Sequence, residues 1–248
     1  MANGKPVFDL DSPERTIQHG LIISQKKKLK EIYTDWYNCL KLNSNYHEGG
    51  KFLELGSGAG FIKEVMPEII TSDILPLPSC DLVLDCTKMP FEENYLDGIV
   101  MIDVFHHIQK VELFLGEVQR TLKPNGILAM SEPWYCNWSK FIYSNFHHEP
   151  FDTGGDWNIP ELGPLSGANG ALPWIVFHRD LDFFNSKFPQ LKLKSIQYHT
   201  PIRYLLSGGV SHKQIVPNWI FDGFKFFDKH LASKSFHLFA FITIQKVI

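Results

Sequence analysis

The sequence contains few cysteines, and their spacing matches neither a disulfide framework nor a metal site. Its 248 residues include four cysteines, none in a C-x-x-C pair and none near a histidine at zinc-ligand spacing. Because small secreted domains depend on dense, regularly spaced cysteines, we expect reduced thiols and a cytoplasmic protein. The four cysteines are Cys39, Cys80, Cys86 and Cys136.

Long apolar runs and an excess of charge of one sign are also missing. No uninterrupted apolar run approaches the roughly 18 residues that span a bilayer, and residues 1–16 lack the apolar core of a signal peptide. The formal net charge is -3, so no overall basic field draws the protein to nucleic acid. We therefore expect a soluble protein with no transmembrane segment and no nucleic-acid partner.

What the sequence does contain is typical of one large α/β domain. Apolar residues make up 44% and charged residues 21% of the chain, close to the average for soluble globular proteins. From residue 51 onward, short apolar runs alternate with stretches of helical periodicity, which predicts a parallel sheet covered by helices on both faces. The predicted strands are residues 51–55, 69–73, 82–85, 98–102, 127–131, 191–200 and 236–245.

Helices are predicted before the first strand and between the fourth and fifth strands. Residues 1–48 form a helical leader, in which Ser12-Pro13-Glu14 has the form of a helix start. The leader's lysines at positions 26, 27, 28 and 30 are expected on a solvated face. Apolar residues at helical spacing between 111 and 122 predict the next helix, which ends at the turn signal of residues 123–126.

Two segments break this regular pattern and are expected to be insertions that form lids. Residues 133–180 are rich in Trp, His, Gly and Pro, and residues 153–173 look like one long loop of the kind that binds ligands. Residues 201–235 include an aromatic helix, and its apolar stripe faces either the core or a lipid-linked substrate. The stripe consists of Ile220, Phe224, Phe227 and Leu231.

A glycine-rich turn after the first predicted strand carries the chemistry. Residues 51–61 read K-F-L-E-L-G-S-G-A-G-F, in which an apolar strand runs into a turn and then into a helix. Glycines let a ligand approach the backbone closely, and Asp73, at the end of the next strand, is placed to accept hydrogen bonds from ribose hydroxyls. The dinucleotide fingerprint needs Gly or Ala where this sequence has Phe61, so an NAD-dependent oxidoreductase is the weaker alternative.

The form E-L-G-S-G-A-G resembles motif I of the class I S-adenosylmethionine (SAM)-dependent methyltransferases, and the resemblance continues in order over residues 50–132. Asp73-Ile74 is similar to the second motif, residues 85–91 to the third, residues 97–108 to the fourth and residues 122–128 to the turn and strand that follow. Within that family the sequence most resembles the methyltransferase type 11 group. One departure is the short helix after motif I, which Pro67 closes.

This resemblance implies a Rossmann-like α/β sheet of about seven strands, the last of them antiparallel, and SAM as the cofactor. In the family, the acid of the second motif holds the ribose and that of the third accepts from the adenine amino group. The fourth motif runs beneath the methionine part of the cofactor. The residues so implied to bind the cofactor are Glu54, Gly56, Ser57, Gly58, Asp73, Ile74, Asp85, Cys86 and Asp103.

A narrower resemblance concerns the acceptor. Residues 132–133, 146–152 and 165–171 are similar to segments of bacterial enzymes encoded beside glycosyltransferases in surface-polysaccharide clusters. This implies a saccharide or another small-molecule acceptor, free or lipid-linked, methylated at oxygen. Carbon and nitrogen acceptors and the oligomeric state stay open. A catalytically silent subunit that binds SAM or a glycolipid is the alternative to an enzyme.

Histidines are the candidates for the base that takes a proton from the acceptor. His106 and His107 follow the fourth predicted strand, near the edge where α/β folds bind ligands. Each is either a contact to cofactor or acceptor or a partly buried histidine satisfied by the backbone. A second polar cluster, residues 147–152, supplies His148 as a further candidate base.

The substrate is expected to contact His147 of that cluster and the residues around the long loop. A loop of small residues presents Asn169, and an aromatic platform with an arginine suits a sugar or phosphate group; in the alternative, the tryptophan only packs on the core. No metal ion is predicted, because adjacent loop residues rarely ligate one ion together. The expected substrate residues are His147, Asn169, Trp174 and Arg179.

Overall fold

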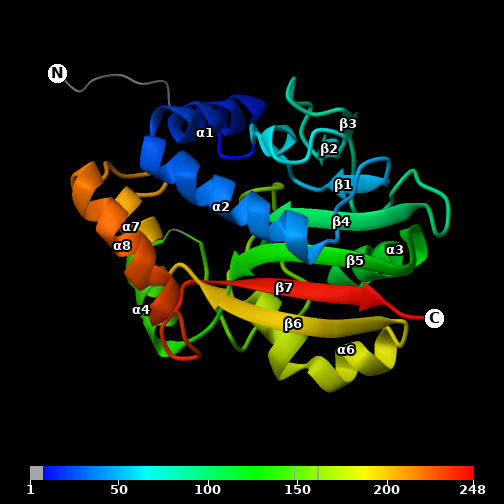
Figure 1. Cartoon of the computed structure of the whole chain (residues 1–248). Coiled ribbons are helices and arrows are strands. Elements are labelled where there is room, and N and C mark those ends of the chain that lie inside the picture. The colour runs from blue at the N-terminus through cyan, green and yellow to red at the C-terminus, as the bar shows by residue number, and fades with distance from the viewer. Residues whose placement is uncertain (1–7, 148, 161) are drawn as a thin grey trace.

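Seven strands form one central sheet with helices on both of its faces (Figure 1). The computed structural model describes residues 8–147, 149–160 and 162–248. The strand order in the sheet is β3-β2-β1-β4-β5-β7-β6. The strands are β1 (Phe52–Glu54), β2 (Ile70–Asp73), β3 (Leu82–Val83), β4 (Leu96–Ile102), β5 (Leu122–Pro133), β6 (Leu191–His199) and β7 (Phe239–Lys246).

Helices precede the sheet, connect its strands and fill the two irregular segments. The α-helices are α1 (Pro13–Gln25), α2 (Lys27–Asn43), α3 (Val111–Thr121), α4 (Asn137–Phe146), α5 (Leu172–Trp174), α6 (Leu181–Lys187), α7 (Arg203–Ser207) and α8 (Asn218–Leu231). Short 3-10 turns are η1 (Ile62–Glu64) and η2 (Phe105–His107), and η3 (Ile175–Arg179) is a π-helical turn. None of the helices among the described residues is long and apolar enough to cross a membrane.

The directions of the strands confirm the expected Rossmann-like methyltransferase sheet. Strands β1 to β5 are parallel to their neighbours, whereas β7 is antiparallel to both β5 and β6. The carboxyl ends of β4 and β5 therefore lie at the same edge of the sheet. Helices α4, α7 and α8 gather at that edge (Figure 1).

Neighbouring residues of the central strands point to opposite faces of the sheet and enter two separate cores. Leu53 and Ile99 pack with α3, η3 and α6 on one face. Phe52 and Val100 pack with α2, α4 and α8 on the other. Burial on both faces explains why these strands are continuous apolar runs rather than alternating ones.

Helix α2 buries the expected apolar stripe, but two of its lysines do not face solvent. Lys28 is only 5% exposed and pairs with Glu31 at 3.0 Å and with Asp222 of α8. Lys26, which caps the start of α2, donates to the backbone carbonyl of Gly209. The expected solvated face is wrong for these two lysines because residues 201–235 fold back over them.

The helix start at Ser12 is confirmed, and the short helix that Pro67 closes is confirmed as the 3-10 turn η1, but the turn predicted at residues 123–126 lies inside a strand. The Ser12 side chain accepts a hydrogen bond from the Arg15 N–H at 3.3 Å. The glycine-rich turn leads only into η1, because Pro67 and the start of β2 leave no space for a longer helix. The predicted turn at residues 123–126 loops out within β5, where Leu122 pairs with Leu96 but Ile127 pairs with Gly98.

Helix α8 is continuous and buries a different aromatic residue from those in the predicted stripe. Phe221 is fully buried in the core with α2, whereas Leu231 is 43% exposed. The side chain of Phe227 lies outside the described residues. Trp219 is 75% exposed. One aromatic residue of this helix therefore packs in the core while another faces solvent.

Candidate active site

A cavity of about 1030 Å³ lies at the carboxyl edge of the sheet. The glycine-rich turn after β1 and the residues that follow β2 and β4 line it. Helix α1 and segments of residues 142–151 and 204–215 contribute further walls. Because α/β folds bind ligands at this edge, the lining residues are the candidates for holding a cofactor and an acceptor.

The glycine-rich turn depends on glycine for its backbone shape and for its packing. Gly56 and Gly58 have φ angles of 62° and 55°, which residues with side chains rarely adopt. A Cβ on Gly56 would lie 2.4 Å from Cγ2 of Val104. The Asp73 carboxylate braces the turn, because its two oxygens accept from the N–H groups of Gly58 and Leu75, each at 2.9 Å.

The remaining residues expected beside the nucleoside also line the cavity. The Ser57 hydroxyl accepts from the Ser72 N–H at 3.1 Å and fastens the turn to β2. The side chain of Ile74 is 52% exposed, which is unusual for an isoleucine. It offers an apolar surface on which a flat ring could pack. Asp85 is exposed, and burial raises the pKa of the Cys86 thiol to about 12, so this cysteine is neutral and apolar.

Two buried carboxylates in the cavity lining each have one oxygen without a hydrogen-bond partner among the described residues. These atoms are Oε2 of Glu54 and Oδ1 of Asp103. Burial raises the pKa of Glu54 to about 7, and burial together with the charge of Glu132 raises the pKa of Asp103 to about 8. A cation bound next to either oxygen would satisfy it, so these carboxylates are candidates for holding an ammonium group.

Helix α1 lies on the glycine-rich turn, a contact that sequence reasoning did not assign to the site. Thr16, His19, Gly20 and Ile23 of this helix line the cavity. A Cβ on Gly20 would lie 2.3 Å from Cβ of Ala59, so the helix backbone rests directly on the turn. The signal available in the sequence is a glycine inside an otherwise helical pattern, which indicates close backbone approach.

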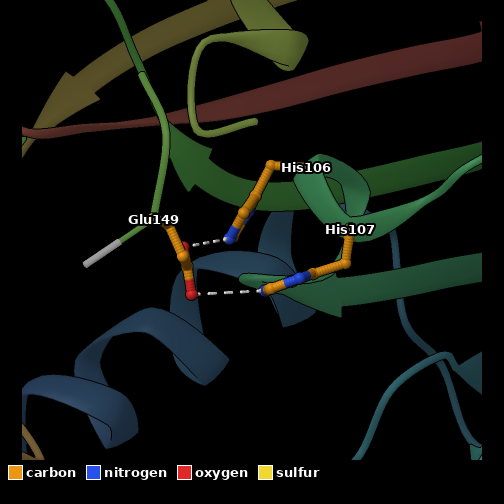
Figure 2. A group of neighbouring side chains, drawn as sticks. All are labelled: His106, His107 and Glu149. Atoms are coloured by element: carbon orange, nitrogen blue, oxygen red, sulfur yellow. Dashed lines mark ion pairs between the residues drawn. The ribbon is translucent and has the colours of Figure 1, made fainter. Parts of the chain in front are cut away.

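Two of the predicted histidines meet an acid from a distant loop (Figure 2). His106 and His107 lie in η2, directly after β4, and Glu149 lies in the loop after α4. Nε2 of His106 is 3.3 Å from Oε2 of Glu149, and Nε2 of His107 is 3.7 Å from Oε1. His147 also lines the cavity, with its Nδ1 3.6 Å from Oε2 of Glu149.

The opposite ring nitrogens of the two histidines are held by fixed acceptors. Nδ1 of His106 lies 2.7 Å from Oε2 of the fully buried Glu132, whose other oxygen accepts two backbone N–H groups of the turn after β4. Nδ1 of His107 donates to the carbonyl oxygen of Gly167 at 3.1 Å. Both rings are therefore oriented with Nε2 toward Glu149.

These contacts give the two histidines different protonation states. Burial by itself lowers the pKa of His106, but hydrogen bonds to Glu132 and Glu149 carry it well above its usual value. Burial and the charge of His106 lower the pKa of His107 to about 4. At neutral pH His106 is thus an imidazolium, and His107 is a neutral imidazole with its Nε2 lone pair toward Glu149. That carboxyl, although buried, has its pKa held below the usual range by His106.

Three residues expected to face the substrate lie outside the lining of the cavity. Asn169 is buried, and its amide exchanges hydrogen bonds with the backbone of Asp152. Trp174 packs against the hydrophobic core, which agrees with the alternative prediction that this tryptophan only packs on the core. Arg179 pairs with Asp180 at 2.7 Å. The expected sugar platform does not form in the cavity, because these side chains hold the long loop against the body of the protein.

Sequence reasoning missed Glu132 as a residue of the site, and it included Glu149 only in the polar cluster of residues 147–152 without giving it a role of its own. Glu132 ends β5, and its position at the carboxyl edge is the signal that could have found it. Glu149 reaches the histidines only because the loop after α4 returns to η2, which no local pattern encodes. His148, the third candidate base, lies outside the described residues.

Aromatic side chains line much of the rest of the cavity. Tyr33 and Tyr37 come from α2, Tyr143 from α4 and Tyr204 from α7. Burial raises the pKa of all four hydroxyls, so these rings are neutral at physiological pH. The cavity therefore offers a largely apolar space next to a small number of charged groups, which is the usual composition of a small-molecule site.

Comparison with known proteins identifies the domain. Residues 53–130 match the family model described as a methyltransferase domain. A sterol 24-C-methyltransferase of Pneumocystis carinii is 31% identical over 112 residues, covering 42% of this chain and 29% of that enzyme. The ubiquinone/menaquinone biosynthesis C-methyltransferase UbiE of Burkholderia mallei is 24% identical over 205 residues, covering 72% of this chain and 79% of that enzyme.

Solved structures share the fold at low sequence identity. Geranyl diphosphate C-methyltransferase from Streptomyces coelicolor A3(2), solved with Mg²⁺, geranyl diphosphate and S-adenosyl-L-homocysteine, has a TM-score of 0.54 at 10% identity over 96% of this chain and 87% of that one. A chain in the complex between the Haloferax volcanii Trm112 methyltransferase activator and a methyltransferase has a TM-score of 0.57 at 12% identity, covering 96% of each chain. At these identities the likeness concerns the fold alone.

The sheet and the glycine-rich turn form an α/β fold with a cavity at its carboxyl edge, and among the described residues two carboxylates of the lining each have an oxygen without a partner. The matching domain model makes the class specific. Residues 53–130 carry a match to a methyltransferase domain, and the S-adenosyl-L-homocysteine in a solved structure of the same fold implies SAM as the cofactor.

Proposed function

We propose that the protein transfers the methyl group of SAM to an oxygen atom of a small, largely apolar acceptor. The observation that carries the proposal is a single cavity lined by both sets of functional groups. The glycine-rich turn and its carboxylates supply a place for the cofactor, and His106, His107 and Glu149 supply groups that can activate a hydroxyl.

At the nucleoside end, the proposed contacts follow from the chemistry of the lining residues. The turn at residues 56–58 lets the cofactor approach the backbone, and Asp73 accepts hydrogen bonds from the ribose hydroxyls. Ile74 and the neutral thiol of Cys86 offer apolar surface to the adenine ring, and Asp85 accepts from its amino group. All of these side chains line the cavity.

At the methionine end, the two partly unsatisfied carboxylates support the placement of the cofactor's ammonium group. Glu54 and Asp103 each have an oxygen that lacks a partner, and both are buried. Leaving such atoms unpaired costs free energy of roughly 1–3 kcal/mol each. A cation held between or beside them removes that cost, which favours binding of the amino-acid part of the cofactor here.

The protein's part in the reaction is orientation, exclusion of water and removal of a proton, since SAM supplies a methyl group already activated on a sulfonium. The acceptor hydroxyl loses its proton as the new C–O bond forms. Nε2 of His107 has a lone pair for that proton, because its Nδ1 is committed to the Gly167 carbonyl. Glu149 would stabilise the imidazolium that results, while His106 fixes the position of Glu149.

The acceptor is proposed to be apolar because of what surrounds it. Rings such as Tyr143, Phe151 and Tyr204 line the cavity, and the relatives are named as methyltransferases of sterol and of ubiquinone/menaquinone biosynthesis. A saccharide, free or lipid-linked, has less support. Trp174 and Arg179, the residues expected to bind it, lie outside the lining.

Carbon is the second candidate acceptor atom. The names of the sterol, quinone and geranyl diphosphate enzymes all specify C-methyltransferases, which favours this alternative. Removing a proton from an enol or phenol hydroxyl also makes its neighbouring carbon nucleophilic. The same cluster of histidines and acid can therefore serve either outcome, and the structure of the product decides between them.

We also propose that the whole chain forms one methyltransferase domain in which residues 133–180 and 201–235 serve as lids. Both segments contribute to the walls of the cavity, with Tyr143 and Glu149 from the first and Tyr204 from the second. Closure of such segments over bound ligands would exclude water from the reaction.

The test is methylation of an acceptor panel with SAM carrying a trideuterated methyl group. The panel contains phenols, quinols, prenyl alcohols, sterols and saccharides, and products are located by mass spectrometry and NMR. A deuterated methyl on oxygen of an apolar acceptor is the expected result, whereas one on carbon establishes the second candidate. If SAM binds but no acceptor yields S-adenosylhomocysteine, the protein is the catalytically silent binding subunit instead.

A further inference from the structure

We propose that His106, His107 and Glu149 form a binding site for one divalent transition-metal ion at the wall of the cavity. The three residues come together from two separated segments, and each directs one ligand atom toward the others (Figure 2). All three side chains are at most 16% exposed, so the site is built into the protein and is not a chance cluster on its surface.

Hydrogen bonding on the far side of the rings fixes both Nε2 atoms toward Glu149. A carbonyl oxygen can only accept, so the bond to Gly167 places the proton of His107 on Nδ1 and leaves a lone pair on Nε2. The acceptor Glu132 likewise favours a proton on Nδ1 of His106. Two ring nitrogens and a carboxylate thus converge, and an ion bound between them would displace the proton that His106 shares with Glu149, which leaves to solvent.

The distances suit a single ion. Metal bonds of about 2.0–2.2 Å place neighbouring ligand atoms roughly 3–3.5 Å apart. Oxygens of Glu149 lie 3.3 Å from Nε2 of His106 and 3.7 Å from Nε2 of His107. All three ligand atoms lie within 4.8 Å of one another, which is close enough for one ion to draw them together.

The outer contacts are those that metal-binding histidines make. Such histidines donate their second ring N–H to a carboxylate or a backbone carbonyl, which fixes the ring and raises its basicity. Here the carboxylate of Glu132 accepts from Nδ1 of His106, and the Gly167 carbonyl accepts from Nδ1 of His107. A competing trio of Asp103, His106 and Glu132 also lies close together, but there Nδ1 of His106 and Oε2 of Glu132 are 2.7 Å apart, which is a direct hydrogen bond with no space for an ion.

Two imidazoles and one carboxylate form a borderline ligand set that suits Zn²⁺, Fe²⁺, Co²⁺ or Mn²⁺ and leaves coordination positions open. Those positions face the cavity. If the function proposed above holds, the ion coordinates the acceptor oxygen, lowers the pKa of its hydroxyl and orients it toward the methyl group, and the proton leaves to solvent. With the ion in place the cluster activates the acceptor by coordination and not by taking its proton on His107.

The experiment titrates chelator-treated protein with Co²⁺ and with Zn²⁺, using calorimetry and the visible absorption of bound Co²⁺. Variants are His107→Asn and Glu149→Gln, with matched controls His47→Asn and Glu48→Gln at exposed positions. One ion per chain is expected for the parent and the controls. Loss of a ligand should weaken affinity by more than the roughly 10–100-fold seen when an outer-shell partner is lost. A SAM-induced rise in melting temperature in each variant shows that it is folded.

Absence of Co²⁺ and Zn²⁺ binding, or equal binding by variants and parent, overturns the metal site. Methyl transfer at full rate by metal-free protein in chelator overturns the ion's role in activation while leaving the proposed function intact. Metal binding that is lost in both variants, without methyl transfer to any acceptor, keeps the site and overturns the function instead.

Discussion

Glu54 and Asp103 connect cofactor binding to pH. In the cofactor-free protein burial raises the pKa of Glu54 to about 7 and that of Asp103 to about 8. An ammonium group binds only to the ionised carboxylates, so protons compete with SAM below these values. An α-amino group stays charged below about pH 7.7. Below that pH, any change in SAM affinity therefore reports protonation of the carboxylates and not of the cofactor's amino group.

We therefore expect SAM affinity to fall as the pH is lowered from about 7.5 to about 5.5, by up to about tenfold per unit for each carboxylate. Calorimetric titration across this range measures the slope. Asp103→Asn should bind SAM more weakly at about pH 7.5 and show a smaller slope. An equal slope in that variant would mean that Asp103 does not contact the ammonium group.

The same raised pKa values affect the stability of the cofactor-free protein. A carboxyl with a raised pKa contributes stability below its ordinary value near 4 and loses it as the pH rises through the folded-state value, here about 7 to 8. Asp103→Asn removes part of that loss. Its melting temperature should exceed that of the parent at about pH 8.5 and approach it only below about pH 4, and the reverse order would contradict the assignment.

Asp73 has two tasks that a substitution can separate. It braces the glycine-rich turn through the N–H groups of Gly58 and Leu75 and is proposed to hold the ribose. Asp73→Ala should abolish SAM binding. Asp73→Asn can replace only one accepted bond and should lose roughly 1–3 kcal/mol of stability together with most SAM affinity. Calorimetry and thermal melting measure both, with the exposed Asp156→Asn as control. Unchanged SAM binding in either Asp73 variant would refute the ribose role.

At the scale of elements, helix α1 lies directly on the turn that is proposed to hold the cofactor. Its backbone at Gly20 touches Ala59, so a methyl group there would push the helix away from the turn. Gly116 of α3 has open space at the same position and serves as a matched helical control.

Gly20→Ala is expected to weaken SAM binding at least about tenfold, even though alanine favours helix by roughly 1 kcal/mol over glycine. Gly116→Ala should keep SAM affinity and raise the free energy of unfolding by up to about 1 kcal/mol. Calorimetry and denaturant unfolding of the two variants distinguish contact from propensity. Equal SAM affinities would show that α1 does not cover the cofactor.

For the molecule as a whole, bound cofactor should stabilise the native state. A ligand at a hundredfold over its dissociation constant adds about 2.7 kcal/mol, which for a chain of this size raises the melting temperature by roughly 5–10 °C. SAM and S-adenosylhomocysteine should both produce this shift, and NAD should not. A shift with NAD and none with the adenosyl ligands would contradict the assigned cofactor.

Much of the sheet and of the turn at the candidate site was predictable because their signals are local. Short apolar runs place all seven strands within a few residues, and the turn at residues 56–58 with Asp73 carries its own motif. The helix start at Ser12 follows from side-chain chemistry in one turn. The turn predicted at residues 123–126 instead lies within β5, because the pairing of Leu122 with Leu96 extends the strand beyond it.

The sequence by itself determined the periodicity, the caps and the order of motifs, because each depends on residues within a few positions of one another. Only the tertiary structure decided which distant groups meet. Examples are Lys28 with Asp222, α1 on the glycine-rich turn, and Glu149 with His106 and His107. The paths of long loops depend on the packing of the whole protein, so no local pattern encodes these contacts, and they include the cluster proposed to act on the acceptor.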